Sequence, residues 1–197
     1  MSPIAPTARR YSAMKTGVAY LAVAGTAIIW SAVAGQLVTR VGVKPVLVVG
    51  MTMLTAGLLF FTQVSVGDSY VRDLLPGFLI IGLGIGFSFV PISISALAGV
   101  KASEAGLASG LINTSQQIGG ALGIAALSTI ATSRTEDSLA TATILPEALV
   151  DGFSSAFLVG AIFAVLGLIA SLTLIRRDEL EPQTLPALEK EPALDAA

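Results

Sequence analysis

Cysteine and histidine are both absent from the 197 residues of this chain, and charged residues make up only 12% of it. The first absence excludes disulfides, thiolate chemistry, haem ligation and histidine-based metal sites. The second sets the chain apart from soluble globular domains, in which about 25% of residues are charged. No basic cluster of the kind that binds nucleic acid is present. We therefore expect no cofactor, no metal and no nucleic-acid partner.

Long stretches without any Asp, Glu, Lys or Arg are the main feature of what is present. About 20 apolar residues in a helix cross the roughly 30 Å hydrocarbon core of a bilayer, and backbone groups in lipid must be hydrogen-bonded within their own segment. The sequence thus predicts an all-α integral membrane protein with five transmembrane helices. The charge-free stretches are residues 17–38, 46–66, 74–100, 105–133 and 152–175.

These stretches also argue against an enzyme. They contain no carboxylate, and the chain has no histidine or cysteine, so the usual bases, nucleophiles and metal ligands are missing from the predicted membrane region. Residues 1–16 are expected to form an extramembrane leader that is retained, because the following apolar run is too long for a signal peptide. Residues 176–197, rich in proline and acidic residues, predict a disordered tail.

The connections between the predicted helices are short, except for residues 134–151. Ser103 and Asp151 stand where each could cap the helix that follows, since a side-chain oxygen there accepts from free backbone amides. Basic residues near the membrane favour the cytoplasmic side, and they predict a plasma-membrane protein whose C-terminus is cytoplasmic. That side carries Arg40, Lys44, Lys101, Arg176 and Arg177, against Arg72 and Arg134 on the other. The basic residues of the leader, Arg9, Arg10 and Lys15, oppose this orientation. Such a conflict is typical of a helix that is normally preceded by other helices.

A glycine-flanked basic motif lies between the first two predicted helices and reads GQLVTRVGVKP. It resembles the loop signature of the major facilitator superfamily, roughly G-x-L-x-D-R-x-G-R-[RK]. Thr39 stands in place of the family's aspartate, and Val43 stands where an arginine is common, which puts a charge relay through this loop in doubt. The matching residues are Gly35, Leu37, Arg40, Gly42 and Lys44.

The fourth predicted helix carries a row of small and amide side chains along one face. At 3.6 residues per turn, Gly106, Gly110, Asn113, Gln117 and Gly120 fall on one stripe, with Gln116 at its edge. Two interpretations stay open: the amides hydrogen-bond to a neighbouring helix, or they line a water-accessible substrate pathway. The block EAGLASGLxNxxxQxGGAxG resembles the penultimate helix of EmrB/QacA-type multidrug:proton antiporters.

The third predicted helix is thinned by glycine and interrupted by proline. Gly82 and Gly86 predict close helix packing, and Pro91 predicts a kink whose freed carbonyl needs a partner. The stretch 75–99 resembles the corresponding helix of the same transporters. Trp30 lies in the middle of the first predicted helix although tryptophan prefers the membrane interface. It is a further candidate for the substrate pathway, with packing against a neighbouring helix as the alternative.

The resemblance implies that the chain corresponds to the last five helices of a major facilitator fold. It then forms a C-terminal fragment of an exporter of drugs or small metabolites, proton-coupled in the intact family but not competent alone. Its expected partners are the lipid bilayer, the missing N-terminal half or another membrane subunit, and small hydrophobic substrates. The alternative function is a small non-transporting membrane protein that acts as a scaffold or modulator of a full-length transporter.

Overall fold

A computed structural model describes residues 13–65, 74–141 and 144–174 of the chain. Nearly all of these residues are helical, and no strand occurs among them. The long helices are α1 (Ala13–Val41), α2 (Val43–Phe61), α3 (Leu75–Leu97), α4 (Ala105–Ala140) and α5 (Leu145–Leu174), and a short 3-10 helix (Ala102–Glu104) precedes α4. The predicted all-α fold is confirmed, whereas the predicted tail, 176–197, and most of the predicted leader, 1–16, lie outside the described residues.

Three of the five long helices, α2, α3 and α5, are long and apolar enough to cross a membrane. The described parts of α1 and α4 do not reach the same standard of length and apolarity. In α4 the reason is visible in the sequence, because glycines and amides occupy its first half and charged residues its last turns. Five transmembrane helices therefore remain a prediction.

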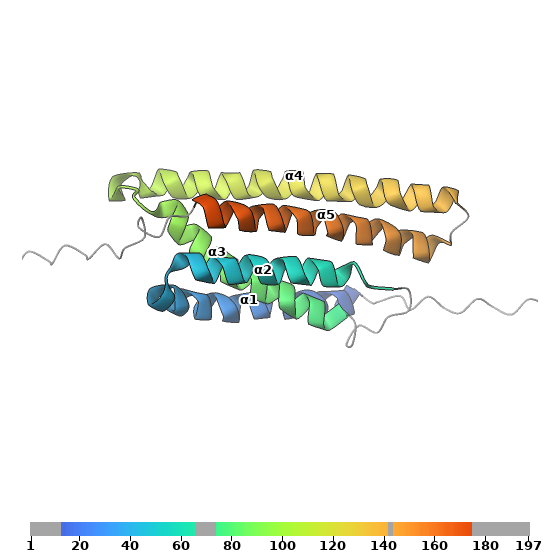
Figure 1. Cartoon of the computed structure of the whole chain (residues 1–197), viewed down its shortest axis with the longest axis horizontal. Helices are drawn as coiled ribbons and strands as arrows, with labels where there is room; N and C mark the ends of the chain where they lie inside the picture. Colours follow the sequence, from blue (N-terminus) through green and yellow to red (C-terminus); the bar gives the residue numbers. More distant parts are fainter. Residues whose placement is uncertain (1–12, 66–73, 142–143, 175–197) are drawn as a thin grey trace, which may run out of the picture.

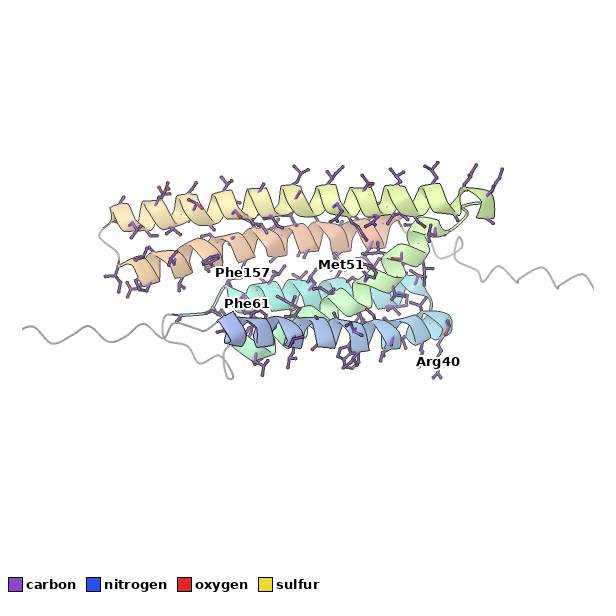
Figure 2. The ribbon with its side chains drawn as sticks, turned by 180° about the vertical axis from the view of Figure 1, so that it is seen from behind. Arg40, Met51, Phe61 and Phe157 are labelled. Atoms are coloured by element: carbon purple, nitrogen blue, oxygen red, sulfur yellow. The ribbon has the colours of Figure 1, made fainter. Side chains whose placement is uncertain are left out.

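The helices pack in the order α1, α3, α2, α5, α4 (Figure 1). Helix α3 runs obliquely and packs on both α1 and α2, while α5 lies between α2 and α4. Met51 of α2 is directed towards α5 (Figure 2), where its terminal methyl group lies next to Gly167. Helix α4 thus forms one edge of the bundle and α1 lies on the opposite side.

Close backbone contact in this bundle is made at glycines of α3. A Cβ added at Gly86 would lie 2.7 Å from the carbonyl oxygen of Ala27 in α1. One added at Gly84 would lie 2.6 Å from the backbone nitrogen of Leu54 in α2. Small residues at such crossings let membrane helices approach closely enough for van der Waals packing. Helix α3 is therefore held on two sides by contacts that only glycine permits.

Two sequence-based expectations about the last helices are wrong. Residues 134–151 were expected to form a long connection, but α4 continues to Ala140 and α5 already begins at Leu145. Asp151 lies inside α5 and caps nothing; its carboxylate accepts a hydrogen bond from the Ser138 hydroxyl at 3.3 Å. Ser103 lies in the 3-10 helix, and the residue at the start of α4 is Glu104, which makes no side-chain cap.

Candidate functional site

The basic motif forms the turn between α1 and α2. Gly42 is the one residue between the two helices, and its φ of 89° is a left-handed conformation that side chains rarely adopt. Its amide donates to the Val38 carbonyl at 2.9 Å, which closes the end of α1. Leu37 packs against the small buried cluster of Ala34, Val46 and Phe87. Gly35, in contrast, faces open space within the described residues.

The two basic side chains of the motif have different surroundings. The Lys44 ammonium group donates to the backbone carbonyl of Leu172 at 2.6 Å, so it ties the start of α2 to the end of α5. Arg40 lies at the end of α1 and points away from the bundle (Figure 2). The motif thus combines a tight turn, one helix-to-helix tie and one exposed cation.

Trp30 lies where α1 crosses α3. Its ring is 5.7 Å from the ring of Phe87, and its Cβ would be 3.0 Å from a Cβ added at Gly86. The neighbouring Ser31 hydroxyl donates to the Gly86 carbonyl at 3.4 Å. Trp30 is still 36% exposed, so the same side chain packs on α3 and leaves part of its ring uncovered. Both interpretations of Trp30 therefore stay open.

Pro91 is fully buried inside α3. Because proline has no amide hydrogen, the carbonyl of Phe87 loses its usual helical partner. The adjacent Ser88 hydroxyl is buried and has no hydrogen-bond partner among the described residues, and the same holds for Ser95. Around Pro91, α3 therefore has a locally weakened hydrogen-bond ladder.

The row of small and amide side chains on α4 is uncovered. The α4 row comprises Gly106, Gly110, Asn113, Gln117 and Gly120, with Gln116 at its edge. All three amide residues are exposed, and α4 has no buried residue. A Cβ added at any of the three glycines would meet nothing within 4 Å. Among the described residues the amides have no hydrogen-bond partner, so the interhelical bonds that one interpretation requires are not made within this part of the chain.

Helix α4 packs on α5, and the two helices run side by side along most of α4 (Figure 1). A Cβ added at Gly152 of α5 would collide with Thr135 and with the Ala131 carbonyl, and Leu127 lies beside Gly160. The α4 row, in the first half of α4, lies on an exposed face that these contacts do not cover. Trp30 and the α4 row are not brought together, because α1 and α4 lie on opposite sides of the bundle (Figure 1).

An aromatic cavity of about 410 Å³ lies at the end of the bundle where α2 ends and α3 and α5 begin. Phe61 is one of its lining residues: its ring stacks on that of Phe157 at 5.2 Å (Figure 2) and lies 5.0 Å from that of Phe78. Its described lining residues are Val23, Phe61, Val64, Leu74, Phe78, Ile81, Val150, Phe153, Ser154 and Phe157.

This cavity was not predicted from the sequence, although one signal for it is present. Phe61 ends α2, Phe78 lies near the start of α3, and Phe153 and Phe157 lie one turn apart in the first half of α5. In an antiparallel succession of helices these positions come to the same end. The chemistry of such a cavity is the binding of an apolar or aromatic molecule rather than acid–base catalysis.

Comparison with known proteins agrees with this membrane architecture. The family profile of the Major Facilitator Superfamily matches residues 1–124. The chain belongs to the major facilitator superfamily. Within this superfamily it is similar to the puromycin resistance protein pur8 of Streptomyces alboniger, with 37% identity over 158 residues, which cover 79% of this chain and 31% of the relative.

Two further relatives in the superfamily also carry resistance in their names. The tetracenomycin C resistance and export protein of Streptomyces glaucescens is 33% identical over 126 residues, covering 64% of this chain and 23% of the relative. The multidrug resistance protein Stp of Mycobacterium tuberculosis is 31% identical over 122 residues, covering 62% and 22%. The chain spans about a third or less of the length of these curated relatives. It is thus a multi-pass membrane protein of a transporter superfamily.

Proposed function

We propose that this chain forms part of a membrane exporter of hydrophobic drugs, antibiotics or related metabolites. Within this exporter the α4 row lines one wall of the substrate pathway. The names of the relatives support the substrate class, since they refer to resistance to puromycin, to several drugs and to tetracenomycin C. The remaining walls come from helices that are not in this chain, either an N-terminal half or another membrane subunit.

The observation that carries the proposal is the uncovered face of α4. Unpaired amide groups are costly in hydrocarbon, so Asn113, Gln116 and Gln117 require water, a polar partner or a substrate. The glycines beside them present open backbone surface, which lets a neighbouring helix or a bulky ligand come close. A pathway shared with further helices supplies both water and a close neighbour, whereas direct exposure to lipid supplies neither.

Proton coupling is part of the same proposal and follows the resemblance to EmrB/QacA-type antiporters. Ionisable residues inside membranes mark proton routes. The charge-free stretches of this chain contain none, so the coupling carboxylates are assigned to other helices and the chain alone does not export. The protein resides in the plasma membrane, with the Arg40 end of the bundle and the C-terminus in the cytoplasm.

A chimeric exporter tests the function. The matching region of the puromycin resistance relative is replaced by this chain, and efflux of puromycin and of other hydrophobic antibiotics is measured in cells that lack other exporters. We expect export by the chimera and none by this chain alone in liposomes given a pH gradient. Gln117→Leu should change the relative rates for different substrates by about tenfold, the effect of one buried hydrogen-bonding group.

Leu111→Ile is the matched control, because Leu111 is an exposed apolar residue outside the α4 row. It should leave the substrate profile unchanged. If Gln117→Leu also leaves the profile unchanged at normal expression, the amides serve packing and the pathway assignment is wrong. Gradient-driven efflux by the isolated chain would overturn the need for further helices. A chain that co-purifies with a full-length relative without altering its transport would instead fit the scaffold alternative.

A further inference from the structure

The end of the bundle that holds the α1–α2 turn is positively charged. Arg40 lies in the last turn of α1, Lys44 lies in the first turn of α2, and Lys101 precedes the 3-10 helix that leads into α4. Glu104 is the one carboxylate at this end among the described residues. Arg40 and Lys101 are exposed, and Arg40 has no partner in the described part of the chain. Arg40, Lys44 and Lys101 are together called the basic end.

Helix α5 finishes within the basic end. The Lys44 ammonium group donates to the Leu172 carbonyl at 2.6 Å, which places the last described turn of α5 beside the start of α2. On its other side α5 packs on α4, whose first turn follows Lys101 (Figure 1). The chain that continues from Leu174 therefore starts between the cations of two neighbouring helices.

The sequence after α5 has the opposite charge. Residues 178–197 contain six carboxylate side chains and one basic side chain, that of Lys190, and are called the acidic tail. Arg176 and Arg177 precede the tail, so they add positive charge close to the end of α5. The basic end and the acidic tail are thus complementary in charge and adjacent along the chain.

The tether between the two is short. Asp178 follows Leu174 by four residues and Glu181 follows it by seven. An extended chain of that length keeps their Cα atoms within roughly 13–25 Å of the end of α5. Axes of packed helices are about 8–10 Å apart, so the cations on the neighbouring helices are within reach. A flexible tether this short gives an effective concentration on the order of millimolar.

We propose that the acidic tail binds the basic end, so that the chain carries its own anionic ligand for the α1–α2 turn and for the connection into α4. Ion pairs between exposed side chains are weak one by one, but several act together when a tether holds them close. Such a contact needs no fixed fold of the tail and leaves the hydrogen bonds of α5 unchanged. It does not require export, so it stands separately from the proposed transport function.

An anionic lipid headgroup is the competing occupant of the basic end. Its phosphate would suit Arg40 and Lys101 equally well. The tail is favoured because it is tethered beside the site, whereas a lipid must be drawn from the bilayer. A negatively charged bilayer surface also repels the tail, so the basic end is the complementary surface nearest to it. Binding of the tail would keep lipid phosphates off these cations.

Distances between two spin labels test the proposal. The chain has no cysteine, so nitroxides attach only at Val41→Cys and Leu188→Cys. Val41 is 53% exposed and adjoins Arg40, and Leu188 adjoins Glu189 of the tail. Double electron–electron resonance is recorded on the purified full chain in a neutral detergent. We expect a short-distance population that falls about threefold or more between about 0.1 M and about 1 M salt, as the Debye length drops from about 10 Å to about 3 Å. Distances that do not change with salt would overturn the proposal.

Charge variants locate the contact. The pair Arg40→Gln and Lys101→Gln should reduce the short-distance population by about threefold. The control pair Arg72→Gln and Arg134→Gln removes the same charge from the connections at the other end of the bundle and should leave the population unchanged. Equal effects of the two pairs would contradict the assignment.

A charge exchange guards against indirect effects of the variants. Arg40→Glu with Lys101→Glu should abolish the short-distance population, and adding Glu189→Lys with Glu191→Lys should restore it. The full set of four substitutions keeps the pairing but exchanges its signs. Failure of the second pair to restore the short distances would overturn the proposal.

Native mass spectrometry separates the tail from a lipid. The chain is purified from bilayers that contain phosphatidylglycerol, and retained lipid is counted. Glu189→Gln with Glu191→Gln should retain about threefold more phosphatidylglycerol than the unaltered chain, because the tail then competes less. Equal retention by the two, with loss of the lipid in Arg40→Gln and Lys101→Gln, would show a lipid phosphate as the occupant and would overturn the proposal.

Discussion

Glycine residues occupy two kinds of position in this bundle. Gly82, Gly84 and Gly86 lie where helices cross, and a methyl group at any of them would meet backbone atoms of α1 or α2 at 3.0 Å or less. Gly106 and Gly110 face open space. At the crossings, the missing side chain of glycine sets the distance between the helices. On α4, the missing side chain leaves backbone surface that a partner outside the described residues can contact.

Gly86→Ala should therefore destabilise the bundle, because the new methyl group would lie 2.7 Å from the Ala27 carbonyl and 3.0 Å from the Ser31 nitrogen. Overpacking of this kind costs about 1–3 kcal/mol of unfolding free energy. Gly110→Ala is the control and should be neutral or stabilising by up to about 1 kcal/mol, the difference in helix propensity. Thermal unfolding of the purified chain in detergent, followed by circular dichroism at a helix band, measures both.

Equal stability of the two variants would mean that α1 and α3 do not cross at Gly86.

The sequence predicted Gly82 and Gly86 as packing residues, together with the α4 glycines, on the same argument of small-residue spacing. Spacing alone does not tell which glycines find a neighbour, because that depends on which helices lie on each side. The structure places neighbours at the glycines of α3 and none within 4 Å of a Cβ at Gly106, Gly110 or Gly120 of α4.

The ends of the helices link the elements to one another. Lys44, at the start of α2, donates to the carbonyl of Leu172 near the end of α5, although the two residues are 128 positions apart. Because this bond joins two helices that are far apart in the sequence, it contributes to the α2–α5 contact near the last described turns of α5.

Lys44→Gln should accordingly loosen the end of α5. A hydrogen bond to a charged donor at a surface position is worth about 0.5–1.5 kcal/mol, so backbone amides in the last turns of α5 should exchange with deuterium roughly two- to tenfold faster. Arg40→Gln is the control, since Arg40 points away from the bundle, and it should leave that exchange unchanged. Equal protection in both variants would show that the Lys44 contact contributes nothing to the end of α5.

Helix boundaries were predictable only in part. Charge-free stretches located all five helices, because apolar length is what a membrane crossing requires. They misplaced the end of α4 and the start of α5, since a helix continues beyond the hydrocarbon region wherever its backbone stays hydrogen-bonded. Glu147 and Asp151 were consequently assigned to a loop, although they lie on α5. That misassignment concealed their position in a polar depression that shares Val150 with the aromatic cavity.

The cavity itself depends on tertiary structure. Phe61, Phe78 and Phe157 come from three helices, and their rings meet only because α3 crosses beside α2 and α5 packs on the other side. The loop motif, in contrast, was accessible from the sequence, because a left-handed turn between two helices requires glycine locally, as Gly42 shows.

At the scale of the whole molecule, the bundle has a packed side and an open side. Helices α1, α2 and α3 share the α3 crossings, and α5 joins them through α2. Helix α4 lies at the edge of the bundle and packs mainly on α5 (Figure 1), and among the described residues its α4 row is uncovered. For a chain that spans about a third or less of its relatives, this open side is where we place the pathway and the further helices.

Cysteine accessibility tests that placement most directly, because the chain contains no cysteine of its own. In the chimeric exporter, Gln117→Cys should react with a membrane-impermeant, charged thiol reagent, and a transported substrate should slow the reaction. Ile118→Cys, the next residue and an exposed apolar one, should react at least tenfold more slowly, since lipid excludes the charged reagent. Equal reaction at both positions, or a reaction at 117 that substrate leaves unchanged, would contradict the assignment of the α4 row to the substrate pathway.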